Sequence, residues 1–291
     1  MKNDCLIFVH KSESWYLYYT VKQARYFNPD ARIILITDCP QKKLRPYAEI
    51  HNIADYWSGA EVMEEIYQHN SPFTREYEII NFQRWFVVRD FMRRNSVDRA
   101  IYVDSDLLVC DSLFPDFDRL GDAQLGIVGY QGPYTMLIPD VKVVADFCDF
   151  IEFMYREEGE LLTAQYNEWK KVTPNVSVTD MHALHTFISR KGLKPLDLSQ
   201  VFEGAMYDTI VQESDGLKLK DGSKDVRWIG GHAYVETASS SQKIRMKTLH
   251  CQGAAKGLIL KLFAAKDFGY YRDRVTFKVS EIATKAGLRS A

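Results

Sequence analysis

The chain has 291 residues, of which 46% are hydrophobic and 13% are aromatic, and its formal net charge at pH 7 is −2. This length suits one large α/β domain or two small ones, with enough apolar residues for a substantial core. The near-neutral charge argues against a nucleic-acid-binding protein, which usually carries a basic face.

The five cysteines are scattered singly and include no Cys-x-x-Cys pair. This pattern is typical of reduced thiols in a reducing compartment. The apolar segment at residues 5–9 is too short for a signal peptide. No stretch of the sequence approaches the ~20 apolar residues that a membrane-spanning helix needs. We therefore expect a cytoplasmic protein.

The beginning of the chain predicts a β-α-β unit, an order that favours parallel pairing and a right-handed crossover. The expected strand, helix and buried strand lie at residues 5–10, 14–27 and 32–37. Polar residues lie at the ends of both strands, His10 and Lys11 at the end of the first and Asp38 directly after the second. Ligands of open α/β sheets bind beyond the carboxyl ends of the strands. These three residues are therefore candidate ligand contacts.

The rest of the chain continues to alternate strands and helices and shows no internal repeat or linker. Hydrophobic periodicity and turn residues predict, in chain order, a short strand at 50–56, helices at 59–69 and 79–94, strands at 101–103, 125–130 and 135–138, helices at 141–156 and 180–190, and a β-hairpin within 217–234. Residues 157–178 are polar and are expected to form a loop around a short helix. The simplest organisation is one domain at residues 1–260 with a helical tail at 261–291.

The most informative motif is Asp104-Ser-Asp106, which follows the apolar run 101–103. Two carboxylates at the end of a strand are costly to bury unless they are protonated, paired or bound to a cation. Divalent cations that prefer oxygen ligands often bridge to substrate phosphates, so the motif indicates a metal that holds a diphosphate. The alternative is that Asp106 caps the following turn while Asp104 is simply solvated.

A second motif near the end of the chain is His250-Cys-Gln-Gly253-Ala-Ala-Lys256. A neutral imidazole can complete the coordination of a Mn²⁺-type cation. A glycine lets the backbone approach an anion closely, and a lysine supplies a point charge for a phosphate. An isolated histidine would more simply be a partly buried, hydrogen-bonded residue, but the whole string favours the metal and phosphate interpretation.

Together the two motifs resemble those of the GT-A glycosyltransferases. They are most similar to the retaining, nucleotide-sugar-dependent enzymes of glycosyltransferase family 8 and its bacterial relatives. The resemblance covers nearly the whole chain and implies an α/β fold of the GT-A type, with a Rossmann-like mixed sheet flanked by helices. It also implies that Mn²⁺ or Mg²⁺ is bound by Asp104, Asp106 and His250. By the same resemblance, Gly253 and Lys256 hold the diphosphate.

The resemblance extends to two further positions. The family places an Arg or Lys on the helix before the acid pair, which corresponds to Arg84. It also places an acid at the start of a later helix beside the donor sugar, which corresponds to Asp180. These two are the expected catalytic residues. Further contacts to the nucleotide-sugar are expected from Arg84, His10, Lys11, Asp38 and Ser105.

The sequence departs from the family pattern at three places around the donor sugar. Met181 stands where the family usually has Gln, and Gly257 replaces the usual Pro after the lysine. The family's Asn-Ser-Gly segment is not evident, and residues 131–136 stand in its place. The identity of the transferred sugar therefore does not follow from the resemblance.

The sequence predicts a metal-dependent glycosyltransferase that moves a sugar from a nucleotide-diphosphate donor, expected to be a UDP-sugar, to a hydroxyl acceptor. Two alternatives stay open, namely sugar nucleotidyl transfer on a similar scaffold and non-catalytic binding of a nucleotide-sugar. A Mg²⁺-dependent phosphatase also uses an Asp-x-Asp motif, but that fold carries the pair on its first strand. Here a β-α-β unit and further elements precede the pair.

The segment after residue 260 combines apolar and aromatic residues with repeated lysines and arginines. Segments that lie on a membrane surface pair an apolar face with basic residues that attract anionic lipid. Peripheral membrane contact is therefore one expectation for this tail. The other is a helix packed on the flank of the domain with its lysine head groups in solvent.

Overall fold

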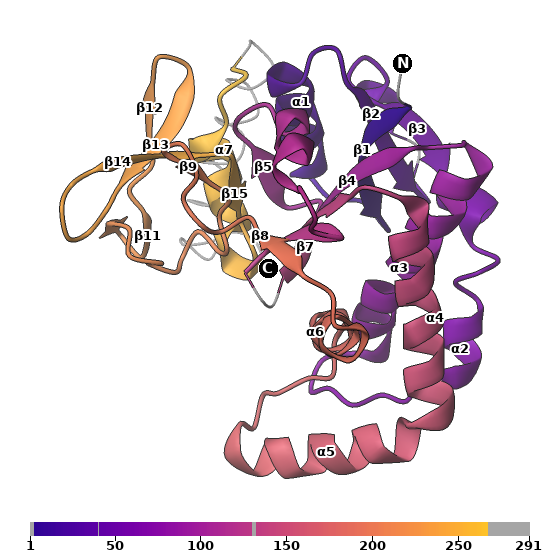
Figure 1. Ribbon diagram of the computed structural model, residues 1–291. Coiled ribbons are helices and arrows are strands. Elements are labelled where there is room, and N and C mark those ends of the chain that lie inside the picture. The colour runs from indigo at the N-terminus through magenta and orange to yellow at the C-terminus, as the bar shows by residue number, and fades with distance from the viewer. Residues whose placement is uncertain (1–2, 40, 130–131, 267–291) are drawn as a thin grey trace, which may run out of the picture.

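The computed structural model describes residues 3–39, 41–129 and 132–266. Its centre is a seven-stranded sheet (Figure 1) with the strand order β3-β2-β1-β4-β7-β6-β8. Among the described strands of this sheet, only β7 runs antiparallel to its neighbours. The strands are β1 (Asp4–His10), β2 (Arg32–Thr37), β3 (Glu49–Asn52), β4 (Arg99–Val103), β6 (Leu125–Val128), β7 (Gly132–Ile138) and β8 (Pro195–Asp197). The expected α/β class with a mixed sheet flanked by helices is confirmed.

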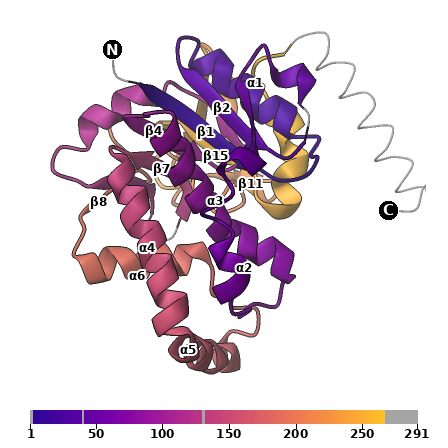
Figure 2. The same cartoon turned by 90° about the vertical axis from the view of Figure 1, so that its right-hand side faces the viewer.

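Alternating side chains of the central strands pack against helices on both faces of the sheet. In β1, Cys5 and Ile7 join one buried cluster, whereas Leu6 and Phe8 join another, as the two-residue period of a strand requires. The first cluster includes the apolar stripes of α3 and α4, which run side by side in Figure 2, and the second includes α1. The helices are α1 (Leu17–Phe27), α2 (Val62–Ile66), α3 (Arg75–Arg94), α4 (Val141–Glu157), α5 (Gly159–Val172), α6 (Asp180–Lys191) and α7 (Ile259–Leu262), with 3-10 helices η1 (Lys42–Leu44), η2 (Ile53–Tyr56), η3 (Phe114–Arg119) and η4 (Gly253–Leu258).

The C-terminal part of the chain adds smaller sheets beside the central one (Figure 1). A four-stranded sheet has the order β12-β13-β14-β9, β10 pairs with β11, and β5 pairs with β15. The turns Asp221-Gly222 and Gly230-Gly231 have positive φ at both residues, a backbone that two-residue hairpins favour. The hairpin expected here is therefore present. These strands are β5 (Leu107–Val109), β9 (Ala205–Met206), β10 (Leu219–Lys220), β11 (Ser223–Lys224), β12 (Arg227–Ile229), β13 (His232–Glu236), β14 (Lys243–Met246) and β15 (Thr248–His250).

The largest difference from the sequence expectation lies at residues 157–178, where α5 forms a helix of 14 residues instead of a loop around a short helix. Leu162 and Tyr166, one helical turn apart, are both buried and anchor this helix. The polar residues around them conceal the helical period. The strand expected at 50–56 is also wrong in its second half, because the Asn52 side chain caps a 3-10 helix there.

The described end of the chain packs onto the domain. Leu260, Leu262 and Phe263 are buried in a third apolar cluster, and the Phe263 ring centre lies 5.2 Å from that of Tyr19. These apolar side chains therefore contact protein and do not face outward. The rest of the tail, residues 267–291, lies outside the described residues. Within the described parts of the chain, no helix is long and apolar enough to cross a membrane.

Candidate functional site

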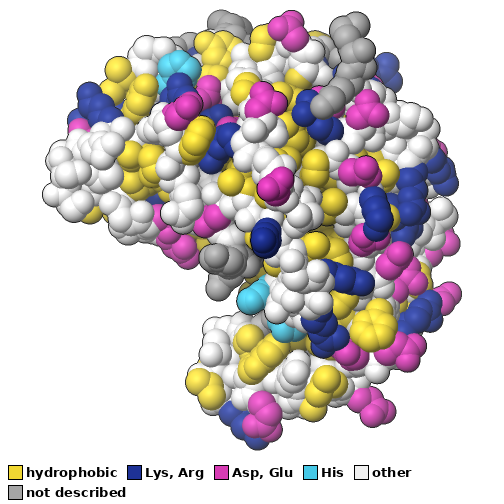
Figure 3. Space-filling model, in the orientation of Figure 1, with side chains coloured by type: hydrophobic (Ala, Val, Ile, Leu, Met, Phe, Trp, Pro, Cys, Tyr) yellow, Lys and Arg dark blue, Asp and Glu magenta, His cyan; other side chains and the backbone are white. Residues whose placement is uncertain are grey.

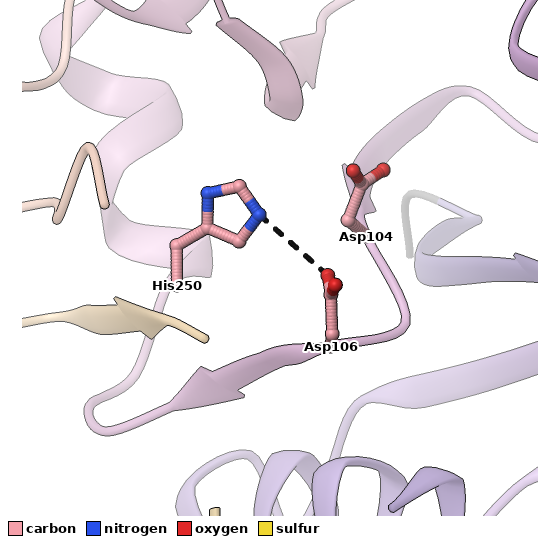
Figure 4. Close-up of side chains that lie close together, drawn as sticks. All are labelled: Asp104, Asp106 and His250. Atoms are coloured by element: carbon pink, nitrogen blue, oxygen red, sulfur yellow. Dashed lines mark ion pairs between the residues drawn. The ribbon is translucent and has the colours of Figure 1, made fainter. Parts of the chain in front are cut away.

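A short antiparallel ladder brings the two acids and His250 together. β5 follows Asp106 directly and pairs with β15, so that Leu107 lies opposite His250. The backbone N–H of Cys251 also donates to the Asp106 carbonyl, at 3.1 Å. Figure 4 shows the resulting cluster, in which ligand atoms of Asp104, Asp106 and His250 all lie within 4.8 Å of one another. The three side chains expected to bind a metal thus share one site.

A hydrogen bond fixes which ring nitrogen of His250 faces the acids. Nδ1 donates to the Thr209 carbonyl at 2.8 Å, since a carbonyl only accepts. Nε2 lies 3.6 Å from Asp106 Oδ1 (Figure 4) and is the atom open to a proton or a cation. Burial alone would lower the pKa of His250, but the carboxylates of Asp106 and Asp104 outweigh burial and raise it. A cation that binds Nε2 would therefore displace a proton.

Two donors orient Asp104. Arg84 Nη1 and the Tyr102 hydroxyl each donate to Asp104 Oδ1 at 2.7 Å. Asp104 Oδ2 has no hydrogen bond to the described residues, so it is available to a cation. Burial raises the pKa of Asp104 and prevails over the Arg84 guanidinium, which lowers it. Two carboxylates and one imidazole form a donor set that suits Mn²⁺ or Mg²⁺.

Arg84 connects the metal cluster to α6. Its Nη2 donates to Asp180 Oδ2 at 2.6 Å, and the Trp85 indole N–H donates to the same oxygen at 2.9 Å. The side chains of Arg84 and Asp180 are only 13% and 4% exposed. Asp180 is also the first residue of α6, where the helix dipole favours a carboxylate. The guanidinium therefore bridges Asp104 and Asp180, which come from distant parts of the sequence.

Lys256 and Gly253 lie on η4, close behind β15. Lys256 Nζ is 3.2 Å from Asp106 Oδ2 and 5.3 Å from the centre of the Tyr16 ring. Burial would raise the pKa of Asp106, but its pairs with His250 and Lys256 outweigh burial and lower the pKa. Gly253 has a φ of +57°, which favours glycine. Lys256 is thus near enough to the acids to share an anionic ligand with a bound cation.

The other expected contact residues frame the space beside Lys256. His10 Nδ1 lies 2.9 Å from Ser105 Oγ, and the buried Nε2 of His10 has no partner among the described residues. Burial lowers the pKa of His10, which keeps its ring neutral near pH 7. Lys11 Nζ lies 4.8 Å from the centre of the Trp57 ring. Asp38 Oδ1 accepts a backbone N–H from the loop after β1 at 2.7 Å.

Two clefts meet at the acid cluster. The first, here the lysine cleft, holds about 830 Å³ of empty space and is lined in part by His10, Lys11, Ser105 and Lys256. The second, here the aspartate cleft, holds about 1590 Å³ and is lined in part by Thr179, Asp180, His250 and Gln252. Both clefts are lined by Tyr77, Asn81, Arg84 and Asp104. Figure 3 shows the molecule hollowed between the small sheets and α5.

Sequence reasoning missed the residues that support the side chains of the Asp104, Asp106 and His250 cluster. Tyr102 lies within the apolar run of β4, and Thr209 acts through its backbone carbonyl. The Tyr134 ring centre lies 4.4 Å from that of His250, and Asp208 Oδ2 accepts the His250 backbone N–H at 2.9 Å. No sequence spacing links these residues to their partners, because the fold alone brings them together.

Asp208 belongs to a buried ion pair that fixes this corner of the site. It pairs with Lys224, and neither side chain is exposed to solvent. Lys224 Nζ also donates to the Ile210 carbonyl at 3.1 Å. Lys224 thereby contacts Asp208 and Ile210, the residues on either side of Thr209 in the sequence. The Thr209 carbonyl orients the His250 ring. We infer that this ion pair keeps Nε2 of His250 aimed at the acids.

The variant Asp208→Ala is expected to weaken Mn²⁺ binding about 10- to 100-fold, the usual effect of losing a group that supports a metal-bound histidine. A titration that follows free Mn²⁺ by electron paramagnetic resonance measures this affinity, with circular dichroism to show that the variant is folded. The exposed Asp122→Ala is a matched control that should bind Mn²⁺ like the wild type. Wild-type affinity in a folded Asp208→Ala protein would contradict the role of the buried pair.

Comparison with known proteins gives matches in structure only. No family model matches the chain, and no curated protein sequence matches it. Several solved structures of glycosyltransferases resemble it. A galactosyltransferase, LgtC, in complex with donor and acceptor sugar analogues, is 16% identical over 71% of this chain and 76% of its own, with a TM-score of 0.40.

Two further glycosyltransferases are similar to a comparable degree. Mouse xyloside xylosyltransferase 1 is 13% identical, with 67% of this chain and 85% of its own covered and a TM-score of 0.43. The glycosyltransferase GlyE of Streptococcus pneumoniae TIGR4 is 18% identical, with 67% of this chain and 45% of its own covered and a TM-score of 0.40.

Proposed function

We propose that this protein is a GT-A glycosyltransferase that moves a sugar from a nucleotide-diphosphate donor, expected to be a UDP-sugar, to a hydroxyl acceptor. The observation that carries the proposal is the position of Asp104, Asp106 and His250. These potential metal ligands lie where the lysine cleft meets the aspartate cleft, which contains the buried Asp180. That arrangement suits a diphosphate on one side of a divalent cation and a sugar on the other.

The lysine cleft has the groups that a nucleotide-diphosphate needs. A bound Mn²⁺ or Mg²⁺ would neutralise charge on the departing diphosphate. Lys256 Nζ would bind a phosphate oxygen, and the backbone at Gly253 would allow close approach of the diphosphate. Arg84 would add a fixed positive charge next to Asp104. His10 Nε2, buried without a partner among the described residues, would receive a polar group of the nucleoside.

On the other side of the cluster, Asp180 is the best candidate to orient the donor sugar or to stabilise positive charge that develops on it. Its position beside Arg84 and Trp85 supports this role, since both donors hold one of its oxygens in place. Retention of the anomeric configuration, and a place in glycan or polysaccharide biosynthesis, belong to the proposal through the family resemblance. Cytoplasmic localisation, and membrane contact through residues 261–291, stay predictions.

A screen of UDP- and GDP-sugars with Mn²⁺ tests the function. Metal-dependent release of the nucleoside diphosphate, abolished by a chelator, is the expected result. A sugar nucleotidyltransferase would instead release pyrophosphate from a nucleoside triphosphate and a sugar phosphate. A non-catalytic binding protein would bind a nucleotide-sugar without releasing either product. Either of these outcomes would overturn the proposal.

The variant Lys256→Ala is expected to weaken UDP binding about 10- to 100-fold while leaving uridine binding nearly unchanged. A charge-assisted hydrogen bond to a phosphate is worth about 1.5–3 kcal/mol, and uridine has no phosphate to lose. Isothermal titration calorimetry with both ligands, in the presence of Mn²⁺, measures the two affinities. Lys261→Ala, an exposed lysine on α7, is the matched control. Equal losses for uridine and UDP would count against the role of Lys256.

A further inference from the structure

The mouth of the aspartate cleft carries two exposed aromatic side chains. Phe73 and Tyr77 are 55% and 57% exposed, although large apolar side chains are usually buried. Their ring centres lie 5.7 Å apart with the planes tilted by 56°. Both residues line this cleft, and we call the pair the aromatic rim. Exposed apolar groups that gather beside a cleft indicate a binding surface.

The aromatic rim is held in place by hydrogen bonds on both sides of it. The Thr74 side chain caps α3 by accepting the Tyr77 backbone N–H at 3.3 Å, and Ser71 Oγ accepts the Phe73 N–H at 3.1 Å. Ser71 Oγ also lies 3.0 Å from Ser177 Oγ, and Ser177 is another residue that lines the cleft. These hydrogen bonds therefore fix the backbone at both residues of the aromatic rim.

The aspartate cleft is lined by neutral polar side chains in addition to its carboxylates. Amide and hydroxyl groups line the cleft at Asn81, Asn175, Ser177, Thr179 and Gln252. The side chains of Asn175, Thr179 and Gln252 have no hydrogen-bond partner among the described residues, so they are free to bind a ligand. Amides and hydroxyls both donate and accept hydrogen bonds, which suits a ligand that carries many hydroxyl groups.

The cations of the site are distributed unevenly between the two clefts. The lysine cleft contains Lys11 and Lys256. Among the described residues that line the aspartate cleft, Arg84 is the one lysine or arginine, and its guanidinium is already bound by Asp104 and Asp180. Away from the metal cluster, an anionic ligand would find no free lysine or arginine in this cleft and would face the carboxylates of Glu78 and Glu213.

From these observations we propose that the aspartate cleft binds the acceptor, and that the acceptor is a neutral saccharide. One apolar face of a sugar ring packs on the aromatic rim, while ring hydroxyls bond to the amides and hydroxyls of Asn175, Thr179 and Gln252. One hydroxyl oxygen of the acceptor forms a bond to the anomeric carbon of the donor sugar while the bond from that carbon to the diphosphate oxygen breaks. The nucleoside diphosphate leaves with the bonding electrons, and its freed oxygen takes the proton of the acceptor hydroxyl. This inference rests on the proposed function for the existence of an acceptor, and goes beyond it in naming the acceptor's class.

Direct binding tests the inference independently of catalysis. The full chain, with Mn²⁺ and UDP, is applied to an array of neutral oligosaccharides and their phosphorylated and uronic-acid counterparts. We expect retention on neutral glycans, and a loss of affinity of about 10-fold in Phe73→Ala, on the scale of one aromatic contact. Phe153→Ala is the matched control, because Phe153 is also exposed (46%) but lies on α4 outside both clefts.

Acceptor kinetics provide the second measurement. In Phe73→Ala the KM for a neutral saccharide acceptor should rise about 10-fold. In the control Phe153→Ala, both this KM and the hydrolysis of the donor by water should stay at their wild-type values. Preference for phosphorylated or acidic glycans, or wild-type glycan binding in Phe73→Ala, would overturn the inference. Glycan binding without donor hydrolysis would overturn the proposed transferase and leave the saccharide site standing. Donor hydrolysis without neutral-glycan binding would overturn the saccharide site and leave the proposed transferase standing.

Discussion

Replacing Asp106 with alanine is expected to lower metal-dependent release of the nucleoside diphosphate by about 1000-fold, the scale of losing one main electrostatic contact at a reaction centre. The Asp106 carboxylate faces both the His250 ring and the Lys256 ammonium. Without it, a cation keeps only Asp104 and His250, and two basic groups lose the anion that they share. Initial rates of UDP release at saturating Mn²⁺, together with the Mn²⁺ affinity, measure the effect.

Folding should survive the Asp106 substitution, because this carboxylate lies between two strands and outside the apolar clusters. Asp106→Asn keeps the shape and removes only the charge, so it should lose metal binding to a similar degree. Glu168→Gln removes an exposed acid on α5, with 70% of its side chain accessible, and should behave like the wild type. Unchanged UDP release in a folded Asp106→Ala protein would falsify the metal-dependent mechanism.

The variant Arg84→Leu is expected to lose about 3–5 kcal/mol of unfolding free energy, as is usual when one partner of a buried ion pair is removed. Arg84 neutralises both Asp104 and Asp180, whose side chains are 20% and 4% exposed. Without the guanidinium, two carboxylates are left beside each other with little access to water. Urea denaturation followed by circular dichroism measures the change, which is a large share of the ~5–15 kcal/mol stability of a typical domain.

A double variant separates the loss of charge pairing from the loss of packing. Arg84→Leu combined with Asp180→Asn removes one of the two uncompensated charges, so it should recover part of the stability that Arg84→Leu loses. The same double variant should stay inactive, because both expected catalytic residues are gone. If Arg84→Leu were as stable as the wild type, the guanidinium could not be the group that neutralises the two acids.

The elements predicted best from sequence are those whose apolar residues repeat with a clear period. The apolar run at residues 33–36 predicts β2 at its observed bounds (Arg32–Thr37), and the apolar stripe of α4 predicts all but the last residue of that helix. α5 could not be predicted in the same way. Only three of its residues are buried, so most of its sequence has the polarity of a loop. Its position depends on packing against α4, which no local pattern encodes.

The residues of the candidate site show the same difference between those that a local sequence pattern predicts and those that only the fold brings together. Asp104, Asp106, His250 and Lys256 could be predicted because each belongs to a short string whose chemistry is coherent by itself. Asp208 could not be predicted, since its partner Lys224 and its contact with β15 arise only when the small sheets form. Residues that bind a ligand leave a local pattern, whereas residues that orient them are specified by three-dimensional packing.

The β5–β15 ladder also sets when the site can form during synthesis of the chain. Asp106 lies next to β5 and His250 ends β15, so 144 residues (250 minus 106) separate the two ligands in the sequence. At about 5–20 residues per second, a ribosome needs about 7–30 s to make that segment. Throughout that interval the two aspartates have been translated but have no histidine partner. A nascent chain therefore completes the cluster of Asp104, Asp106 and His250 only after all seven strands of the central sheet have been made.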